Sequence, residues 1–456
     1  MHEFPKLLPL PELEQLPEVP LQDPWPAPRV QSTADVTLSL PGSKSLTNRE
    51  FVLAALASEP SILRRPLISR DTVLMAEALE QLGVGVLRLP ATGEYGPDIV
   101  ILPPEQFSQD DVTIDCGLAG TVMRFLPPMA ALANARVTFT GDEGALGRPM
   151  KGITDGLRAL NIVLDPEDAD FLPFDVLGSG AVHGGEITID ASASSQFVSG
   201  LMLVGARFKK GLTIRHSGER VPSLPHIEMT IQTLRDRGIE VESLGNGVWR
   251  VPAGTIRGRN LTIEPDLSNA APFLASALLR GGTVTIQDWP TSTTQVGAQL
   301  ETLLALFGAS FSRNGDSLTI DGGLGVLGGA SFPGLDLDLS EAGELSPTIA
   351  GLCAFATSPS RLTGIGHLRG HETDRLAALA AEINALGGQV TVEEDGLSIV
   401  PQPLHGGVWH SYHDHRMATT GALIGLAVDG LSVENIATTA KTLPEFPQLW
   451  QKLAGQ

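Results

Sequence analysis

The chain has 456 residues, 42% of them hydrophobic and 5% aromatic, and carries a formal net charge of −21 at pH 7. This length exceeds what one hydrophobic core usually organises, and the acidic balance argues against nucleic acid as a partner. Two cysteines, Cys116 and Cys353, are too few for a disulfide framework and indicate a reducing compartment, which we expect to be the cytoplasm. No apolar run reaches the roughly 18 residues of a membrane-spanning helix, so no membrane association is expected.

Residues 1–39 predict a proline-rich arm with little secondary structure that leads into the domain formed by the C-terminal half. The arm starts MHEFPKLLPL, without the basic stretch and apolar run of a secretory signal peptide. We therefore expect the arm to belong to the folded protein and not to a targeting signal.

From residue 40 onward, a strand-like run that ends in aspartate and leads into an alanine- and leucine-rich helix recurs along the chain. A unit of the same shape, without the aspartate, begins at Pro41. The aspartates follow one another at intervals of 75, 76, 72 and 76 residues and are Asp115, Asp190, Asp266, Asp338 and Asp414. Intervals this regular predict six structural repeats of about 75 residues.

Each repeat also carries a second, amphipathic helix that usually ends near a glycine and runs into another strand, as in ETDRLAALAAEINALGGQV, residues 372–390. Short strands alternating with two helices predict an α/β fold of repeated βαβαββ-like units. The first helix of each repeat is apolar on nearly every face, so we expect it to be buried inside its domain. Six repeats divide into two similar domains of three, at 40–264 and 265–456.

Charged and polar residues gather at the starts of these otherwise apolar helices. Because helix N-termini present unpaired N–H groups and a partial positive charge, they suit phosphate and carboxylate ligands. Cations at such positions are unfavourable unless an anion completes the site, so their recurrence predicts a site for anionic ligands. The basic residues are Lys44, Arg49, Arg124, Arg369, Arg375, Arg416 and Lys441.

Three further patterns resemble ligand sites by their letters alone. Glycines within residues 323–328 match a dinucleotide fingerprint, but the sequence continues GASFPG instead of entering a helix. The segment PGSKS lacks the glycine before Lys44 that a P-loop requires. Three histidines between residues 410 and 415 have no cysteine beside them. We therefore expect no metal and no other cofactor.

Seven motifs together resemble the 5-enolpyruvylshikimate-3-phosphate (EPSP) synthases and occur in that family's order. They are LPGSKSLTNR (40–49), LAGTVMR (118–124), GRPM (147–150), SSQF (194–197), HETDRL (371–376), DHRMA (414–418) and KTLPEF (441–446). The resemblance implies an inside-out α/β barrel of two similar domains with inward helices. It also implies enolpyruvyl transfer from phosphoenolpyruvate to the 5-hydroxyl of shikimate 3-phosphate, with release of phosphate, in chorismate and aromatic amino acid biosynthesis.

The resemblance further assigns a role to individual residues. Glu344 and Glu372 match the family's proton-transfer residues, although which of them handles which proton stays open, and Lys44 is expected to join them in catalysis. Residues implied to contact shikimate 3-phosphate are Lys44, Ser45, Arg49, Ser194, Ser195, Gln196, Ser223, Glu344 and His371. Residues implied to contact phosphoenolpyruvate, and hence the family's inhibitor glyphosate, are Lys44, Gly120, Gln196, Arg375, Arg416 and Lys441.

The chain departs from the family pattern at several positions. The family often has asparagine at Leu118, tyrosine at His226, asparagine at His367 and lysine at His371. It commonly has an arginine just before the RPM motif, where this chain has Gly144, Ala145 and Leu146. Arg124 and Arg148 are the nearby arginines that could replace it, and the sequence does not choose between them.

Two other functions remain as alternatives. One is enolpyruvyl transfer to UDP-N-acetylglucosamine on the same architecture, a family that starts with a GAKN-like segment and carries a loop cysteine. The other is a non-catalytic anion-binding protein, against which the presence of all the acidic and basic motif residues argues. We expect a monomer that closes when both anionic substrates bind.

Overall fold

The computed structural model describes residues 22–31, 33 and 35–455, which divide into two compact units. Of these residues, 41–263 form the first unit, and 22–40 together with 264–455 form the second. The described part of the chain therefore starts in the second unit, passes to the first and returns after residue 263. The earlier part of the predicted arm, residues 1–21, lies outside the described residues.

The second repeat shows the order of elements that the sequence predicts. Its first two strands are parallel, and the other neighbours in its sheet, ordered β6-β7-β9-β8, are antiparallel. The elements are β6 (Val112–Asp115), α3 (Gly120–Ala130), β7 (Arg136–Thr140), α5 (Lys151–Ala159), β8 (Val163–Asp165) and β9 (Phe174–Leu177), with a short α4 (Glu143–Leu146) after β7. This βαβαββ unit confirms the predicted α/β class.

The two other repeats of the first unit follow the same plan. The third has the sheet order β10-β11-β13-β12, from β10 (Gly185–Ile189), α6 (Gln196–Gly205), β11 (Leu212–His216), α7 (Leu224–Asp236), β12 (Glu242–Gly245) and β13 (Val248–Val251). The first repeat borrows its parallel edge strand, β14 (Asn260–Thr262), from the far end of the unit. Its other elements are α1 (Lys44–Ala55), β3 (Ser61–Arg64), α2 (Arg70–Gln81), β4 (Gly85–Leu89) and β5 (Asp98–Leu102).

The second unit repeats the plan with two strands taken from the arm. In the fourth repeat, β2 (Val36–Leu38) pairs in parallel with β15. The other elements are α8 (Ala270–Arg280), β15 (Thr283–Ile286), α9 (Leu300–Ala305), β16 (Ser310–Asn314) and β17 (Ser317–Asp321). The fifth repeat contains β18 (Asp336–Asp338), α10 (Ser346–Cys353), β19 (Ser360–Thr363), α11 (Arg375–Ala385), β20 (Gln389–Glu393) and β21 (Gly396–Val400).

The sixth repeat is completed by the earliest described strand of the chain, β1 (Trp25–Pro26), which pairs antiparallel with β23. The remaining elements are β22 (Gly407–Trp409), α12 (His415–Gly425), β23 (Leu431–Val433) and α13 (Phe446–Ala454). A strand of the predicted N-terminal arm thus completes a sheet formed by β22 and β23 of the C-terminal repeat. This pairing attaches the described part of the arm to the second unit.

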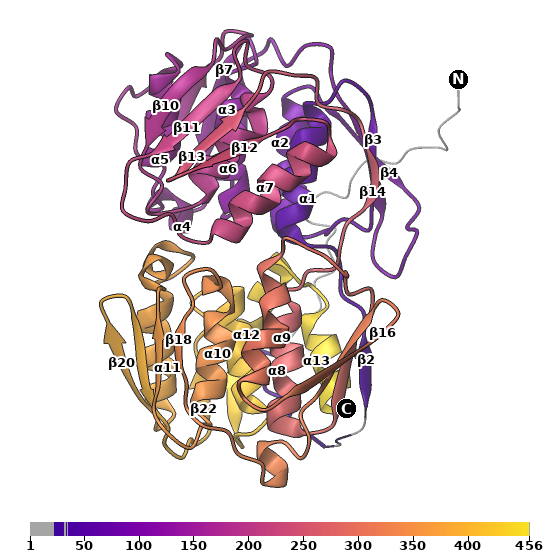
Figure 1. Cartoon of the computed structure of the whole chain (residues 1–456), viewed down its shortest axis with the longest axis vertical. Coiled ribbons are helices and arrows are strands. Elements are labelled where there is room, and N and C mark those ends of the chain that lie inside the picture. Colours follow the sequence, from indigo (N-terminus) through magenta and orange to yellow (C-terminus); the bar gives the residue numbers. More distant parts are fainter. Residues whose placement is uncertain (1–21, 32, 34, 456) are drawn as a thin grey trace. The chain divides into compact units, whose positions relative to one another are not determined.

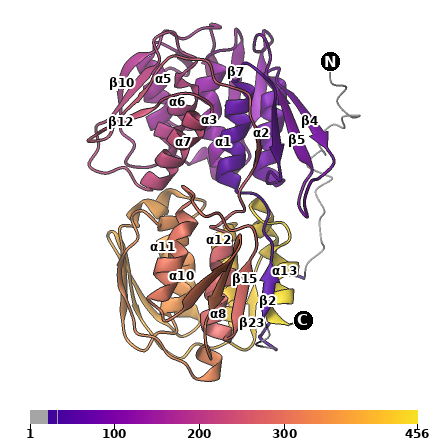
Figure 2. The ribbon, with the colours of Figure 1, turned by 45° about the vertical axis from the view of Figure 1, so that its right-hand side comes forward.

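The first helix of each repeat lies inside its unit, with the sheets outside (Figures 1 and 2). All residues of α3, α8 and α10 are buried, as their apolar sequences predict. In the first unit α3 packs against α6, where the absence of a side chain at Gly200 is required because a β-carbon there would lie 2.1 Å from the carbonyl oxygen of Arg124. This close approach fixes the starts of the two helices relative to each other.

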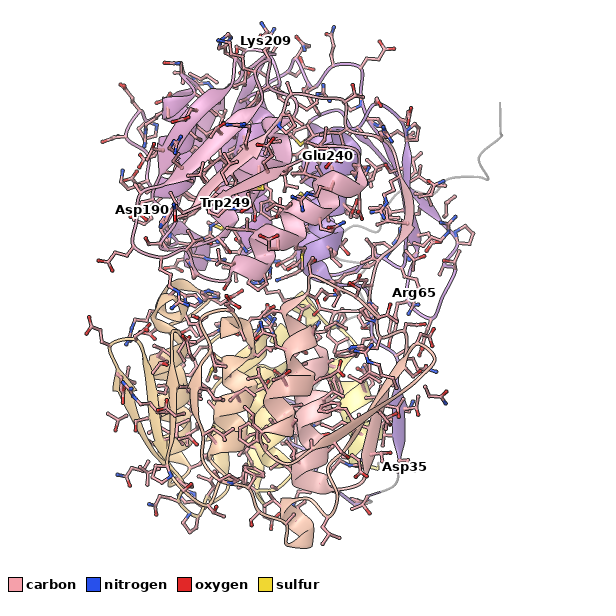
Figure 3. The ribbon with its side chains drawn as sticks, viewed as in Figure 1. Asp35, Arg65, Asp190, Lys209, Glu240 and Trp249 are labelled. Atoms are coloured by element: carbon pink, nitrogen blue, oxygen red, sulfur yellow. The ribbon has the colours of Figure 1, made fainter. Side chains whose placement is uncertain are left out.

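In the first unit, Lys209 and Glu240 are exposed, whereas Trp249 on β13 is 4% exposed (Figure 3). Within the described part of the chain, no helix combines the length and apolar character needed to cross a bilayer.

Candidate functional site

The inner helices are buried except near their first turns. In α1 every residue after Leu46 is buried, and in α6 only Gln196 is not. In α12 the residues that are not fully buried are Arg416 and Thr419. The partly exposed residues at these helix starts include four predicted site residues, Lys44, Ser45, Gln196 and Arg416. The polar first turns of these apolar helices are therefore accessible to a ligand.

Lys44 begins α1 and is held by a carboxylate that sequence reasoning missed. Its Nζ lies 3.1 Å from Oδ2 of Asp71, which is buried in the first turn of α2. Ser43 caps the N-terminus of α1 by accepting from the backbone N–H of Leu46 at 3.5 Å. The ion pair with Asp71 holds the ammonium group of Lys44 at the start of α1. In the sequence alone, Asp71 looks like an ordinary acidic residue in the first turn of a helix.

Arg49 is 1% exposed and joins three helices of the first unit. Its Nε donates to Oγ1 of Thr230 at 2.8 Å, and its Nη2 donates to the carbonyl of His226 at 3.0 Å. The guanidinium also lies over the ring of Phe125, 5.3 Å from its centroid. These contacts give Arg49 a structural role that the sequence-based expectation of a ligand contact did not include.

Two arginines and a glutamine converge on Gly120, the first residue of α3. Nη1 of Arg124 donates to Oε1 of Gln196 at 2.8 Å, and Nη1 of Arg148 donates to the carbonyl of Leu118 at 2.9 Å. A β-carbon on Gly120 would lie 3.0 Å from Nη1 of Arg124, 3.0 Å from Nη2 of Arg148 and 3.2 Å from Oε1 of Gln196. Glycine therefore leaves open the space between these three polar groups.

The three predicted serines stand at the starts of two helices of the third repeat. Ser195 is the N-cap residue of α6, and Oγ of Ser194 accepts from the backbone N–H of Gln196 at 3.2 Å. Ser223 is the N-cap residue of α7 and has φ +53°, a left-handed conformation that is uncommon for serine. Neither N-cap side chain, Ser195 or Ser223, makes a capping hydrogen bond itself.

In the second unit Glu372 lies between two cations. Its Oε1 accepts from Nζ of Lys441 at 2.6 Å, and its Oε2 accepts from Nη2 of Arg375 at 3.0 Å. His371 lies at the edge of this group, with Nδ1 4.0 Å from the same Oε2. Lys441 ends the 3-10 turn Ile436–Lys441, so residues 69 positions apart in sequence meet at one carboxylate.

Asp414 is the second carboxylate that sequence reasoning did not assign to the site. Asp414 accepts two hydrogen bonds from Arg375, from Nε of the arginine to Oδ2 at 2.7 Å and from Nη2 to Oδ1 at 3.2 Å. It is also the N-cap residue of α12. Burial by itself would lower the pKa of Arg375, but Asp414 and Glu372 outweigh it and the pKa is raised. Arg375 is therefore a permanent cation with a fixed orientation.

Glu344 is joined to Arg416 and to the fourth repeat. Its Oε2 accepts from Nη2 of Arg416 at 3.0 Å, and its Oε1 accepts from the hydroxyl of Ser268 at 2.7 Å. Since the backbone N–H of Arg416 donates to Asp414 at 2.8 Å, the network continues to Arg375 and Glu372. The structure thus connects the five charged residues of the second unit to which the family resemblance assigns a role: Glu344, Glu372, Arg375, Arg416 and Lys441. Arg369, also expected near the site, pairs instead with Asp374 at 3.3 Å.

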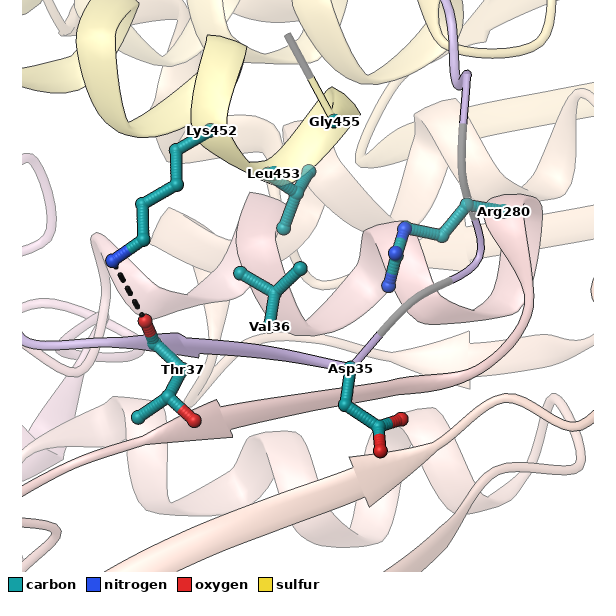
Figure 4. Close-up of a pocket in the computed structure, with 7 residues that line it drawn as sticks. All are labelled: Asp35, Val36, Thr37, Arg280, Lys452, Leu453 and Gly455. Atoms are coloured by element: carbon teal, nitrogen blue, oxygen red, sulfur yellow. Dashed lines mark hydrogen bonds between the residues drawn. The ribbon is translucent and has the colours of Figure 1, made fainter.

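The motifs that were set aside remain outside this network. Residues 323–329 form turns and a short 3-10 helix, Val326–Gly328. Among the described residues no group of three or more His, Cys, Asp or Glu side chains could hold a metal ion. A pocket of about 190 Å³ lined by Asp35, Arg280 and Lys452, among others, contains none of the predicted residues (Figure 4).

Comparisons with known proteins agree with the motifs. A family model described as EPSP synthase (3-phosphoshikimate 1-carboxyvinyltransferase) matches residues 29–450. A 3-phosphoshikimate 1-carboxyvinyltransferase of Kocuria rhizophila is 56% identical over 437 residues, covering 95% of this chain and 97% of that protein. Two solved structures of EPSP synthase from Acinetobacter baumannii share the fold, with TM-scores of 0.74 and 0.73 at 23% and 22% identity. They cover 94% and 93% of this chain and 97% of each solved chain.

Proposed function

This chain belongs to the EPSP synthase family, and from that premise we propose how its own residues transfer an enolpyruvyl group from phosphoenolpyruvate to the 5-hydroxyl of shikimate 3-phosphate. The observation that carries the proposal is the alternating network of carboxylates and cations from Lys441 through Glu372, Arg375 and Asp414 to Arg416 and Glu344. It combines two acid–base groups with fixed anion-binding groups, which this addition and elimination require.

Shikimate 3-phosphate is bound mainly by residues of the first unit. The hydroxyls of Ser194, Ser195 and Ser223 take its phosphate, supported by helix N-termini whose serine side chains make no capping bond. The ring of shikimate 3-phosphate is bound by the other residues that the resemblance assigns to this substrate, which are Lys44, Ser45, Arg49, Gln196, Glu344 and His371.

Phosphoenolpyruvate is bound by groups that offer paired donors or a point charge. Arg375 and Arg416 suit bidentate hydrogen bonds to a carboxylate or a phosphate, whereas Lys441 supplies a compact charge. Gly120 lets the backbone at the start of α3 approach the ligand, while Gln196 and Lys44 lie at helix starts of the same unit. Glyphosate is proposed to occupy this same set of residues.

The chemistry needs one proton-transfer group near the hydroxyl and one near the methylene carbon. Glu344 accepts the proton of the attacking 5-hydroxyl as the oxygen bonds to the central carbon of phosphoenolpyruvate. Glu372 receives a proton from the ammonium group of Lys441 along their 2.6 Å hydrogen bond and gives it to the methylene carbon. As phosphate leaves, Glu372 takes a proton back from the resulting methyl group and returns it to Lys441, while the proton held by Glu344 leaves with the phosphate as hydrogen phosphate. Lys44 offsets the charge that develops on the transferred group.

A phosphate-release assay with purified protein tests the acceptor directly. We expect release from phosphoenolpyruvate with shikimate 3-phosphate and none above background with UDP-N-acetylglucosamine. Release with the nucleotide sugar alone would replace the proposal by the alternative acceptor, and release with neither would favour a non-catalytic anion-binding protein.

Both cysteines are buried, which gives a second test against the alternative acceptor. Burial raises the pKa of the Cys116 thiol and raises the pKa of Cys353 to about 11, so neither is a reactive thiolate at neutral pH. We expect iodoacetamide at pH 8 to leave the activity of the native protein unchanged, and to modify both cysteines after unfolding in urea. Rapid inactivation with modification of Cys116 alone would point to a catalytic cysteine.

The localisation, the oligomeric state and the need for a metal or other cofactor are also proposals. We expect a cytoplasmic monomer that needs no metal or other cofactor and binds no nucleic acid, because its net charge of −21 disfavours a second polyanion. Phosphate release that persists in the presence of excess EDTA, and a monomer mass from light scattering, are the expected results.

A further inference from the structure

Residues 410–413, which include two of the three histidines considered above as metal ligands, form a loop between β22 and α12. The last two residues of the loop, Tyr412 and His413, have φ of +54° and +55°. This left-handed region is unfavourable for a residue with a β-carbon, and such residues visit it mainly one at a time. The loop therefore needs contacts with the rest of the protein to keep its conformation.

A buried carboxylate on α11, Glu382, accepts hydrogen bonds from two residues of this loop. The glutamate is 3% exposed. Its Oε1 accepts from the hydroxyl of Tyr412 at 2.6 Å, and its Oε2 accepts from the backbone N–H of His410 at 2.8 Å. Burial, together with the Glu382 carboxylate, raises the pKa of Tyr412 to about 12. The phenol therefore stays protonated and remains a donor at neutral pH.

The other contacts of the loop do not replace those with Glu382. Oγ of Ser411 is buried and makes no hydrogen bond within the described part of the chain. Nδ1 of His413 lies 3.0 Å from Nδ2 of Asn435, in an exposed contact. Since all four loop residues line a cavity of about 620 Å³, part of the loop has no protein packed against it. Glu382 is therefore the buried group that holds the left-handed conformation.

The loop is followed directly by Asp414, the carboxylate that orients Arg375. The backbone N–H of Asp414 donates to the carbonyl of Ser411 at 2.9 Å, so the loop determines where Asp414 lies. Glu382 is seven residues after Arg375 on α11, which places the two side chains on one face of the helix, about two turns apart. Helix α11 thus contacts residues 410–414 at two points, and a shift of the loop would move Asp414 away from the guanidinium group.

We propose that Glu382 is a positioning residue of the phosphoenolpyruvate site: through Tyr412 and His410 it fixes the loop that presents Asp414 to Arg375. The assignment rests on the function proposed above, in which Arg375 binds phosphoenolpyruvate. In this role Glu382 contacts neither substrate and exchanges no proton with either. Because shikimate 3-phosphate is bound mainly by the first unit, loss of Glu382 weakens phosphoenolpyruvate binding far more than shikimate 3-phosphate binding.

The test begins with Glu382→Ala and its control Glu393→Ala, which removes a carboxylate paired with Arg361 in the same unit. We expect Glu382→Ala to raise KM for phosphoenolpyruvate about tenfold or more, while KM for shikimate 3-phosphate stays within about twofold. Because Glu372 keeps its hydrogen bond to Lys441, kcat should fall by less than about threefold. Glu393→Ala should match the parent protein in all three constants.

Two milder variants separate the hydrogen bonds from a general loss of packing. Glu382→Gln should recover most of the affinity, because its oxygen can accept from the N–H of His410 and its amide can donate to the hydroxyl oxygen of Tyr412. Tyr412→Phe removes the 2.6 Å hydrogen bond alone and should raise KM for phosphoenolpyruvate about threefold. If the two residues act through this bond, adding Tyr412→Phe to Glu382→Ala should cause no further rise.

Three outcomes would overturn the assignment. The first is a parent-like KM for phosphoenolpyruvate in folded Glu382→Ala or, if that variant does not fold, in Tyr412→Phe. The second is an equal rise in both KM values, and the third is a Glu382→Gln protein as impaired as Glu382→Ala. If the parent released no phosphate with these substrates, the proposed function itself would fail. Hydrogen exchange would then decide the role of Glu382: faster exchange at residues 410–414 in Tyr412→Phe would support it, and unchanged exchange would refute it.

Discussion

Glu372→Gln is expected to lower turnover by about 100-fold or more while shikimate 3-phosphate still binds. The amide keeps the shape of the side chain, but its single oxygen can accept from only one of Lys441 and Arg375, which now lie 2.6 Å and 3.0 Å from Oε1 and Oε2. It cannot exchange a proton with the substrate carbon. Because the change also removes a negative charge between two cations, the site becomes more positive, and KM for phosphoenolpyruvate should stay level or fall.

The control for this variant is Glu393→Gln, which makes the same substitution at an exposed ion pair with Arg361 in the same unit. It should leave kcat and both KM values unchanged. Steady-state kinetics separate the two effects of Glu372→Gln, and calorimetry measures shikimate 3-phosphate binding without turnover. Unchanged turnover in Glu372→Gln would remove Glu372 from the mechanism, and a large loss of shikimate 3-phosphate binding would make it a binding residue instead.

The regular spacing of the repeats made the architecture predictable. Asp115, Asp190 and the later aspartates mark strand ends before buried helices, and the apolar sequences of α3 and α8 predicted that these helices lie inside. The strands that complete the sheets were harder to find. β2 and β14 have three residues each, and β1 has two, so any alternation of apolar and polar residues in them is too short to identify a strand.

The partners of the charged residues could not be predicted because they lie far away in the sequence. Lys44 pairs with Asp71 27 positions later, and Arg375 pairs with Asp414 39 positions later. Each aspartate stands at the start of a helix, where a carboxylate is favourable without any other role. The sequence also left Arg124 and Arg148 as equal candidates to replace the arginine that the family has within residues 144–146, whereas the structure brings both to Gly120.

Because side chains of Arg124, Arg148 and Gln196 surround Gly120, the variant Gly120→Ala tests the proposed phosphoenolpyruvate site directly. The added methyl group would meet Nη1 of Arg124 and Nη2 of Arg148 at 3.0 Å and Oε1 of Gln196 at 3.2 Å. These atoms are the ends of flexible side chains and can move by a few tenths of an ångström, and alanine suits the first position of α3. We therefore expect a folded protein in which the methyl group occupies part of the ligand's space.

The expected result is weaker binding of glyphosate, by about tenfold to 100-fold, with a smaller loss of turnover, because roughly 1.4 kcal/mol of steric cost is a factor of ten in affinity. Glyphosate inhibition constants and kcat for the parent and Gly120→Ala, measured at fixed shikimate 3-phosphate, check this. The matched control is Gly147→Ala, since a β-carbon on Gly147 meets nothing within 4 Å. Its inhibition should equal that of the parent. If glyphosate inhibited Gly120→Ala and the parent equally, the ligand would not lie against Gly120.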